Sequence, residues 1–332
     1  MTMPKVLHIG PCDSPGGMAN VMKILAEHPP EGWEAELLAS HVVGSSWAKW
    51  RAYRKARSTL IRTLNDPTQR PDVVHLHTAA DWSWYRKAKF LRILQETDTS
   101  TIVHIHSGQF DAWLDSCSLR RQRAIHDMLQ HPTTTGVVLS HAWKNRLESQ
   151  LGQLSVVSNP IPPGLSPPTE PRSKHNLLLL GRDSAVKGHD FSIELSKRLR
   201  SEFPELSLTL TGRIRAEPSW VRALGWVTED EKHGLLQNSS ILLVPSEYEG
   251  QPMVVLEALA CGLPVCVSNR LVDVPKGVEV APYGDIEHWA RVISELLNSP
   301  PDETTLIESS QVYRIESISG EWKRVYESAI MR

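Results

Sequence analysis

The stretch SEYEGQPMVVLEALACGLPV, residues 246–265, follows an apolar run at residues 241–244. Its Gly-Gln-Pro segment predicts a turn that carries Glu249, and helices accept a proline such as Pro252 in their first turn. A helix that starts there places Glu257 about one and a half turns from its beginning. A buried strand, a turn and a helix form the kind of unit that binds ligands outside the carboxyl ends of parallel strands, and free amides at the helix start suit a phosphate.

The same alternation of short apolar runs and helical patterns extends along the chain and predicts an α/β protein. Residues 159–172, NPIPPGLSPPTEPR, interrupt it with six prolines, which lack backbone donors, so we interpret this stretch as a stiff linker. It separates two predicted doubly wound Rossmann-like domains, residues 1–158 and 173–309. We expect strands near residues 5–10, 35–40, 72–78, 101–107, 136–140, 154–158, 176–181, 206–211, 240–245, 264–268 and 278–281.

Length and composition agree with two soluble domains. The chain has 332 residues and a formal net charge of -2, from 36 basic and 38 acidic residues, which disfavours a general nucleic-acid-binding protein. It has no apolar run of about 18 residues, and the first residues do not resemble a secretion signal. Four scattered cysteines suit reduced, buried thiols. We therefore expect a cytoplasmic protein, with peripheral contact at the inner face of the membrane as an added hypothesis.

Two loops could hold an anion. GRDSAVKG, residues 181–188, follows the apolar run NLLLL, so Arg182 and Lys187 would emerge at the carboxyl end of a strand, where two cations can neutralise a diphosphate. A solvated loop pair is the alternative. In the first loop, Gly16 and Gly17 let the backbone approach a ligand, although, taken alone, an ordinary turn before a helix is the better explanation of the pair. Neither loop has the spacing of a Walker A loop or a dinucleotide fingerprint.

Taken together, these motifs resemble the nucleotide-sugar glycosyltransferases of the GT-B fold, in particular the retaining glycosyltransferase family 4. The resemblance is carried by the Glu-x7-Glu element with its Leu-Glu-Ala and Gly-x-Pro-Val. It extends over most of the chain through weaker segments: Gly16-Gly17, RPDVVHLH at 70–77, HIHSG at 104–108, VVSNPI at 156–161 and GRDSAVKG at 181–188. It implies two domains that face a cleft, with the C-terminal segment 310–332 returning to the first domain as a helix.

The resemblance also implies roles for individual residues. Glu249 would lie by the donor sugar hydroxyls, and Glu257 would hold the ribose. Arg182 and Lys187 would stabilise the departing nucleoside diphosphate, and the glycine pair would face the donor phosphates. Gln251-Pro252 stands where the family commonly has Phe-Gly, which leaves the donor sugar open. The expected donor-binding set is Gly16, Gly17, Arg182, Lys187, Trp226, Val227, Gly250, Gln251, Met253 and Glu257.

Histidines cluster near the ends of two predicted strands. We expect His104 and His106 to point to opposite faces of the sheet, so that only one of them reaches the functional edge. His106 is the better candidate because Ser107-Gly108 follows it at the end of the strand, and the family often has a histidine beside the donor sugar. His75 and His77 form a similar pair that suits either the core or the rim.

No Asp-x-Asp occurs in the sequence. That pair of carboxylates is what a metal-dependent sugar transferase would use to hold Mg²⁺ or Mn²⁺ against a diphosphate. We therefore expect no essential metal and no cofactor, with Arg182, Lys187 and helix-start amides stabilising the leaving group instead. The expected catalytic residues are Glu249, His106, Arg182 and Lys187, and none of them is assigned as a nucleophile.

Residues 45–64, SSWAKWRAYRKARSTLIRTL, hold six cations, three aromatic residues and no acid, and residues 82–89 are similar. They suit an anionic membrane surface or a phosphorylated acceptor. An amphipathic helix with core aromatics and a solvated basic face is the alternative. Nucleic-acid binding is disfavoured because no recognised module accompanies the patch.

The sequence thus predicts a retaining glycosyltransferase that transfers a sugar from a nucleoside-diphosphate sugar to a hydroxyl of a glycan, glycolipid or other acceptor, as in the synthesis of cell-surface polysaccharides or glycoconjugates. Two rivals remain open. A nucleotide-sugar epimerase of the same fold would need no acceptor, and a non-catalytic sugar-nucleotide binding protein would bind the donor without turnover.

Overall fold

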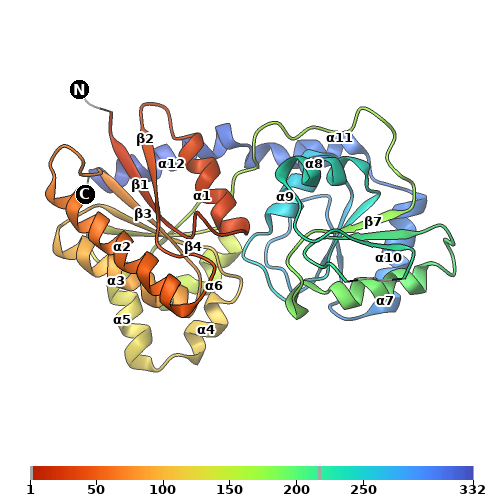
Figure 1. Cartoon of the computed structure of the whole chain (residues 1–332), viewed down its shortest axis with the longest axis horizontal. Helices are drawn as coiled ribbons and strands as arrows, with labels where there is room; N and C mark the ends of the chain where they lie inside the picture. The colour runs from red at the N-terminus through yellow and green to blue at the C-terminus, as the bar shows by residue number, and fades with distance from the viewer. Residues whose placement is uncertain (1–2, 216–217, 332) are drawn as a thin grey trace. The chain divides into compact units, whose positions relative to one another are not determined.

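The computed structural model describes residues 3–215 and 218–331. They form two compact units, one of residues 3–160 with 315–331 and the other of residues 161–215 with 218–314. Each unit is built on a parallel sheet with helices beside it (Figure 1). From Ile161 on, the proline-rich stretch belongs to the second unit, where Ile161 bridges Arg314 and the Arg172 guanidinium donates to the carbonyl oxygen of Leu236 at 2.6 Å.

The first unit has a six-stranded sheet in the order β2-β1-β3-β4-β5-β6, and every pairing in it is parallel. Its helices alternate with the strands, as expected of a doubly wound fold. The elements are β1 (Lys5–Gly10), α1 (Gly17–Glu27), β2 (Glu34–Ala39), α2 (Ser46–Asn65), β3 (Val73–Thr78), α3 (Trp82–Glu96), β4 (Thr101–Ile105), α4 (Phe110–Ser116), α5 (Leu119–Leu129), β5 (Thr134–Val138), α6 (His141–Leu151), β6 (Leu154–Val156) and α12 (Ile315–Ile330).

The second unit repeats the architecture with the strand order β12-β11-β10-β7-β8-β9. All of its pairings are parallel as well. The elements are β7 (Asn176–Leu179), η1 (Ala185–Lys187), α7 (His189–Leu199), β8 (Ser207–Leu210), β9 (Val221–Ala223), α8 (Glu229–Asn238), β10 (Ile241–Val244), α9 (Met253–Ala260), β11 (Val265–Ser268), β12 (Glu279–Ala281), α10 (Ile286–Asn298), α11 (Glu303–Ser310) and η2 (Gln311–Tyr313).

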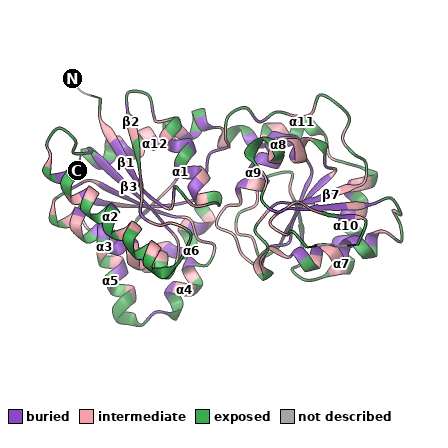
Figure 2. Ribbon diagram, viewed as in Figure 1, coloured by how far each residue is buried: buried purple, intermediate pink, exposed green. Residues whose placement is uncertain are grey.

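The central strands are apolar because both faces of a parallel sheet are covered by helices. In β7, Leu177 packs into a cluster on one face and Leu178 into a cluster on the other, and β10 alternates in the same way. Figure 2 shows the strands near β3 and β7 as buried. The four cysteines are buried and unpaired, as predicted.

The fold class predicted from the sequence is confirmed. Each of the expected strands is present, with ends that differ by a few residues, and the C-terminal helix α12 packs on the first sheet. Strand β9 was not predicted, because a three-residue edge strand with a charged residue at its centre gives no apolar run. No helix in the described part of the chain is both long and apolar enough to cross a membrane.

Candidate functional site

The carboxyl edge of the second sheet brings two predicted loops together. Strands β7 and β10 are neighbours, so the loops that follow them start side by side. The amide of Glu247 donates to the carbonyl oxygen of Val186 at 2.9 Å. Gly188 has a positive φ of 74°, and a Cβ there would lie 2.7 Å from Cγ of Pro245, so only glycine fits this approach. The backbone therefore fixes the loop that carries Lys187 against the loop that carries Glu249.

Lys187 and Glu249, both predicted site residues, are in contact. The Lys187 ammonium donates to Oε1 of Glu249, and the Ser246 hydroxyl donates to the same oxygen at 2.9 Å. Both side chains are partly buried, which strengthens their attraction relative to an exposed pair. The contact places a cation and a carboxylate at the sheet edge where open α/β folds bind ligands.

Glu257 lies in the second turn of α9 and is 1% exposed. Lys232 of α8 donates to its Oε1 at 2.8 Å, whereas its Oε2 is buried without a hydrogen-bond partner in the described ranges. Burial raises the pKa of Glu257 above its ordinary value, and the Lys232 charge opposes this shift. The carboxylates of Glu257 and Glu229 in turn raise the pKa of Lys232, against the effect of burial. Glu257 thus has one paired oxygen and one that can still accept a hydrogen bond.

Lys232 was not singled out from the sequence. A signal for its position was present, because Thr228 and Glu231 form a capping box that begins α8 and puts Lys232 in the first turn. What the sequence does not show is that α8 lies against α9, so the pairing with Glu257 comes only from the fold.

The other predicted donor-binding residues of the second unit lie in the loop after β7, in the segment before α8 and around the start of α9. Arg182 is exposed in the loop after β7 and forms no ion pair in the described part of the chain. Trp226 is 61% exposed just before α8. The remaining residues are partly or fully buried: Val227 before α8, Gly250 and Gln251 in the turn after β10, and Met253 at the start of α9.

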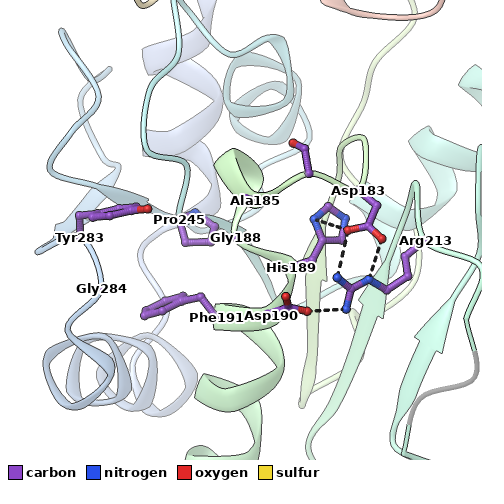
Figure 3. A pocket seen from close by; sticks show the side chains of 11 residues that line it. Asp183, Ala185, Gly188, His189, Asp190, Phe191, Arg213, Pro245, Tyr283 and Gly284 are labelled. Atoms are coloured by element: carbon purple, nitrogen blue, oxygen red, sulfur yellow. Dashed lines mark hydrogen bonds and ion pairs between the residues drawn. The ribbon is translucent and has the colours of Figure 1, made fainter.

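A cavity of about 330 Å³ lies on the α7 side of the loop 181–188 (Figure 3). Arg213 lines it and pairs with Asp183 at 3.0 Å and Asp190 at 2.8 Å. His189, also in its wall, donates from Nε2 to the carbonyl oxygen of Thr211 at 2.9 Å. Because two carboxylates neutralise Arg213, the cavity is not a site for an anion, and we assign it to the packing of the loop on α7.

Gly16 and Gly17 lie at the N-terminus of α1 in the first unit. Gly16 has φ 135°, a conformation that side chains disfavour, and a Cβ there would meet no atom within 4 Å. The turn therefore needs glycine for its backbone conformation, and the open space around it is compatible with a ligand.

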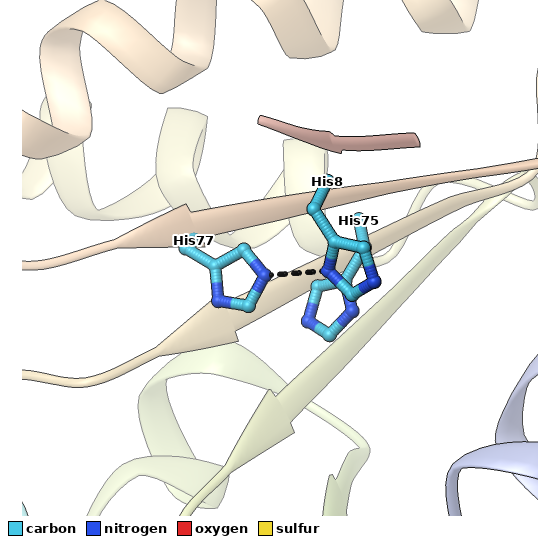
Figure 4. Close-up of side chains that lie close together, drawn as sticks. All are labelled: His8, His75 and His77. Atoms are coloured by element: carbon cyan, nitrogen blue, oxygen red, sulfur yellow. Dashed lines mark hydrogen bonds between the residues drawn. The ribbon is translucent and has the colours of Figure 1, made fainter. Parts of the chain in front are cut away.

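The prediction that His104 and His106 point to opposite faces was wrong. Their ring centroids lie 4.0 Å apart, because residues two positions apart on a strand share a face. The same holds for His75 and His77, whose rings stack at 4.1 Å. His8 of β1 was not among the predicted residues. Its Nδ1 lies 2.9 Å from Nε2 of His77, so it belongs to the same cluster of histidines (Figure 4).

These five histidines form two hydrogen-bonded chains. In one, His77 contacts His8 at 2.9 Å and His106 at 3.0 Å. In the other, His75 contacts the Tyr326 hydroxyl of α12 at 2.9 Å and His104 at 3.3 Å. Burial lowers the pKa of all five histidines, so they are neutral at physiological pH.

Two groups of three, His8-His75-His77 and His77-His104-His106, have ring nitrogens within 4.8 Å of one another, near enough for a metal ion. Neutral imidazole is a common ligand for transition metals. However, most of these nitrogens pair with one another or with Tyr326, and the exceptions among the buried nitrogens of the described residues are Nε2 of His8 and Nε2 of His104. The nearby Lys87 charge also lowers the pKa of His106, after the effect of burial. This electrostatic setting disfavours a divalent cation, so we assign the cluster to the core of the first unit, with His106 partly exposed at its end.

The basic segment 45–64 is mostly the helix α2, which begins after the Ser45 cap. Trp47 and Trp50 are 63% and 52% exposed, so the alternative in which its aromatics form the core is wrong for both. Arg51 and Arg54 stack over their rings. The side of α2 that packs on the unit is formed by Ala56, Leu60 and Leu64.

Comparisons with known proteins agree with this geometry. Residues 174–299 match the family model described as Glycosyl transferases group 1. The chain is 26% identical over 282 residues to a glycogen synthase of Mycobacterium tuberculosis, covering 76% of this chain and 66% of that protein. It is also 26% identical over 204 residues to the MMP alpha-(1->4)-mannosyltransferase of Mycolicibacterium hassiacum, covering 54% of this chain and 49% of that protein. The chain thus spans less than two thirds of the length of these curated relatives.

Among solved structures, sucrose-phosphate synthase from Thermosynechococcus elongatus aligns with a TM-score of 0.74 at 16% identity, covering 98% of both chains. The catalytic domain of starch synthase IV from Arabidopsis thaliana aligns with a TM-score of 0.71 at 13% identity, covering 99% of this chain and 100% of that one. The chain therefore has the GT-B fold, and most of its second unit matches the glycosyltransferase group 1 model.

Proposed function

We propose that this protein is a retaining glycosyltransferase of family 4 that transfers a sugar from a nucleoside-diphosphate sugar to an acceptor hydroxyl. The observation that carries the proposal is the buried Glu257 with its unpartnered Oε2. A buried carboxylate oxygen without a partner is unfavourable by about 1–3 kcal/mol or more, and a donated hydroxyl removes that penalty. A ribose supplies two neighbouring hydroxyls, which suits a nucleotide bound at the start of α9.

The pair Lys187–Glu249 provides the chemistry beside the nucleotide. When the sugar–phosphate bond breaks, negative charge grows on the departing diphosphate, and Lys187 with Arg182 can stabilise it without a metal. Glu249 would accept hydrogen bonds from the donor sugar and hold it in place. The acceptor hydroxyl then attacks on the face from which the diphosphate leaves, and the leaving phosphate takes its proton, so no enzyme nucleophile is required.

The first unit would supply Gly16, Gly17 and His106 to the donor and would bind the acceptor, a glycan, glycolipid or other hydroxyl compound. His106 uses its Nε2 for the hydrogen bond with His77, so we propose that its other ring nitrogen, Nδ1, contacts the ligand. We also propose that the protein acts in the cytoplasm, in the synthesis of cell-surface polysaccharide or glycoconjugate. We further propose peripheral contact with an anionic membrane through the exposed Trp47, Trp50 and the cations of α2.

The test is a transfer assay with a panel of UDP-, GDP-, ADP- and CDP-sugars and a pool of glycan and lipid-linked acceptors. The readouts are nucleoside diphosphate release and the anomeric configuration of the product by NMR. We expect acceptor-dependent release with one base, retention of configuration and no effect of EDTA. Glu257→Gln should reduce the rate, whereas the exposed carboxylate control Glu205→Gln should not.

Other outcomes would contradict the proposal in distinct ways. Conversion of one sugar nucleotide into another without an acceptor would indicate an epimerase. Tight binding of a sugar nucleotide without turnover across the acceptor pool would indicate a binding protein. Inversion of configuration would overturn the retaining assignment.

A further inference from the structure

Lys87 of α3 is a buried lysine at the carboxyl edge of the first sheet. It is 2% exposed, and its ammonium donates to the Ser40 hydroxyl at 3.0 Å. Ser40 follows β2, and its hydroxyl donates in turn to the carbonyl oxygen of Gly10, the last residue of β1, at 3.2 Å. The ammonium therefore lies where β1 and β2 end, the edge at which open α/β sheets bind ligands.

His41, Arg86 and His106 interact electrostatically with this ammonium. Burial lowers the pKa of His41, and the charges of Arg86, Lys49 and Lys87 lower it further. The charge of Lys87 also lowers the pKa of His106 at the end of β4, after the effect of burial. The cations thus converge on one part of the sheet edge.

This cluster has no counter-charge among the residues that the structure describes. Neither Arg86 nor Lys87 forms an ion pair there, and Nε of Arg86 is buried without a hydrogen-bond partner. An ammonium has three donors, and the structure gives Lys87 the single acceptor Ser40. Burial lowers the pKa of Lys87 to about 7, which reflects the cost of keeping this cation in the interior.

A buried cation without a partner is unfavourable unless a ligand compensates it. Lys87 and Arg86 together offer several N–H donors, including a planar guanidinium, which match the oxygens and the double charge of a phosphate better than a single carboxylate. Lys49, exposed on α2, adds long-range attraction.

We propose that Lys87 and Arg86 form a binding site for a phosphate group, with Lys49 and His41 at its rim, and that this group belongs to the acceptor. The inference rests on the proposed function and gives it a substrate class, a phosphorylated acceptor. Lys87 and Arg86 hold the phosphate, so the acceptor is oriented by its charge at the edge of the sheet.

The first experiment uses inorganic phosphate as the probe and thermal unfolding as the readout, with chloride at equal ionic strength as the reference. It is carried out on Lys187→Ala, so that phosphate held by Lys187 in the second unit does not contribute. We expect phosphate to raise the midpoint by several degrees near saturation. Adding Lys87→Met should abolish this rise.

Lys89→Met is the matched control, because it removes the same charge from an exposed position two residues along α3. It should keep the phosphate response. Without phosphate, Lys87→Met should unfold at the same or a higher temperature, since it removes an uncompensated buried cation. If Lys87→Met does not fold, Arg86→Gln provides the second variant, and it should lose most of the phosphate response. No phosphate response in Lys187→Ala, or equal responses in all variants, would overturn the site.

The source of the phosphate is tested with vesicles of phosphatidylcholine with and without phosphatidic acid. Binding that requires phosphatidic acid, is displaced by inorganic phosphate and is lost in Lys87→Met would assign the site to a lipid-linked acceptor. A response to inorganic phosphate without vesicle binding would assign it to a soluble phosphorylated acceptor. Failure of this proposal is separable from failure of the proposed function, because nucleoside diphosphate binding depends on Lys187 and Glu257 and should persist in Lys87→Met alone.

Discussion

Lys232 donates a 2.8 Å hydrogen bond to Oε1 of Glu257, while the second oxygen of this buried carboxylate has no partner among the described residues. The relationship explains how a carboxylate can remain charged inside the second unit and still be ready to bind a ligand. Lys232 supplies the compensating charge, and the open oxygen supplies the acceptor. A change of Lys232 is therefore expected to affect stability, and a change of Glu257 is expected to affect ligand binding.

Lys232→Met should lower the free energy of unfolding by about 3 kcal/mol at pH 8, because it leaves Glu257 buried and unpaired. Burial then raises the pKa of Glu257 unopposed, so the folded state binds a proton more readily than the unfolded state. The loss should therefore be smaller at pH 6 than at pH 8. Urea unfolding at both pH values measures this, and adding Glu257→Gln should restore part of the stability. A loss that does not change with pH or with the second substitution would contradict the pairing.

The buried histidines should make the protein sensitive to mild acid. His8 has a folded-state pKa of about 3 because of burial, against an ordinary value of 6.5. Between these values the unfolded state binds more protons, so stability falls as the pH falls, at about 1.4 kcal/mol per pH unit for one histidine. Denaturant unfolding at pH 6 and pH 5 measures how the free energy of unfolding changes with pH. This change should be smaller in His8→Gln than in the wild type by about 1.4 kcal/mol per pH unit. Equal slopes in the two proteins would mean that His8 is protonated without penalty.

Gly212 lies so close to the loop 181–188 that a side chain there should lower both the free energy of unfolding and the rate of sugar transfer. Gly212 has φ 77°, and a Cβ there would lie 2.2 Å from the carbonyl oxygen of Gly181 and 2.8 Å from Cα of Arg182. Gly212→Ala should destabilise the protein by about 1–3 kcal/mol and displace this loop, with a loss of sugar transfer. Gly234→Ala is the control, since nothing lies within 4 Å of its Cβ position in α8, and it should stabilise by about 0.5–1 kcal/mol. Full transfer activity in folded Gly212→Ala would show that the loop position is unimportant.

The exposed face of α2 should bind anionic vesicles. The double variant Arg54→Gln with Lys55→Gln removes two exposed cations. Each cation near an anionic membrane contributes about 1 kcal/mol, so the variant should bind vesicles that contain phosphatidylglycerol about 30-fold more weakly. Arg120→Gln with Arg121→Gln removes the same charge from α5 and should have a smaller effect. Cosedimentation with vesicles measures both variants. Equal losses would indicate attraction by net charge alone and would exclude a specific role for α2.

Much of the fold could be predicted from the sequence because buried parallel strands give continuous apolar runs and the helices between them are amphipathic. Residues 241–268 show this most clearly: strand, turn, helix and strand occur where the pattern placed them. The edge strand β9 could not be predicted, because it contributes three residues and little apolar surface.

The site was less accessible to sequence reasoning. Glu249 and Lys187 were expected from their motifs, but their contact depends on β7 and β10 being neighbours although 62 residues separate the two side chains. The partner of Glu257 comes from α8, and the groups that interact with Lys87 or with His41 beside it come from α2, α3 and the residues after β2. Such pairings follow from tertiary packing, which a local pattern does not contain.

The proposed function requires the second unit to bind a nucleoside diphosphate through Lys187 and Glu257. Isothermal titration with UDP, GDP, ADP and CDP tests it most directly on the wild type, Lys187→Ala, Glu257→Gln and the exposed control Lys174→Ala. We predict that one nucleoside diphosphate binds, that Lys187→Ala and Glu257→Gln each weaken it by about 10- to 100-fold, as for a lost hydrogen bond to a charged group, and that Lys174→Ala does not. Absence of binding by all four nucleotides, or equal affinity in all four proteins, would contradict the claim.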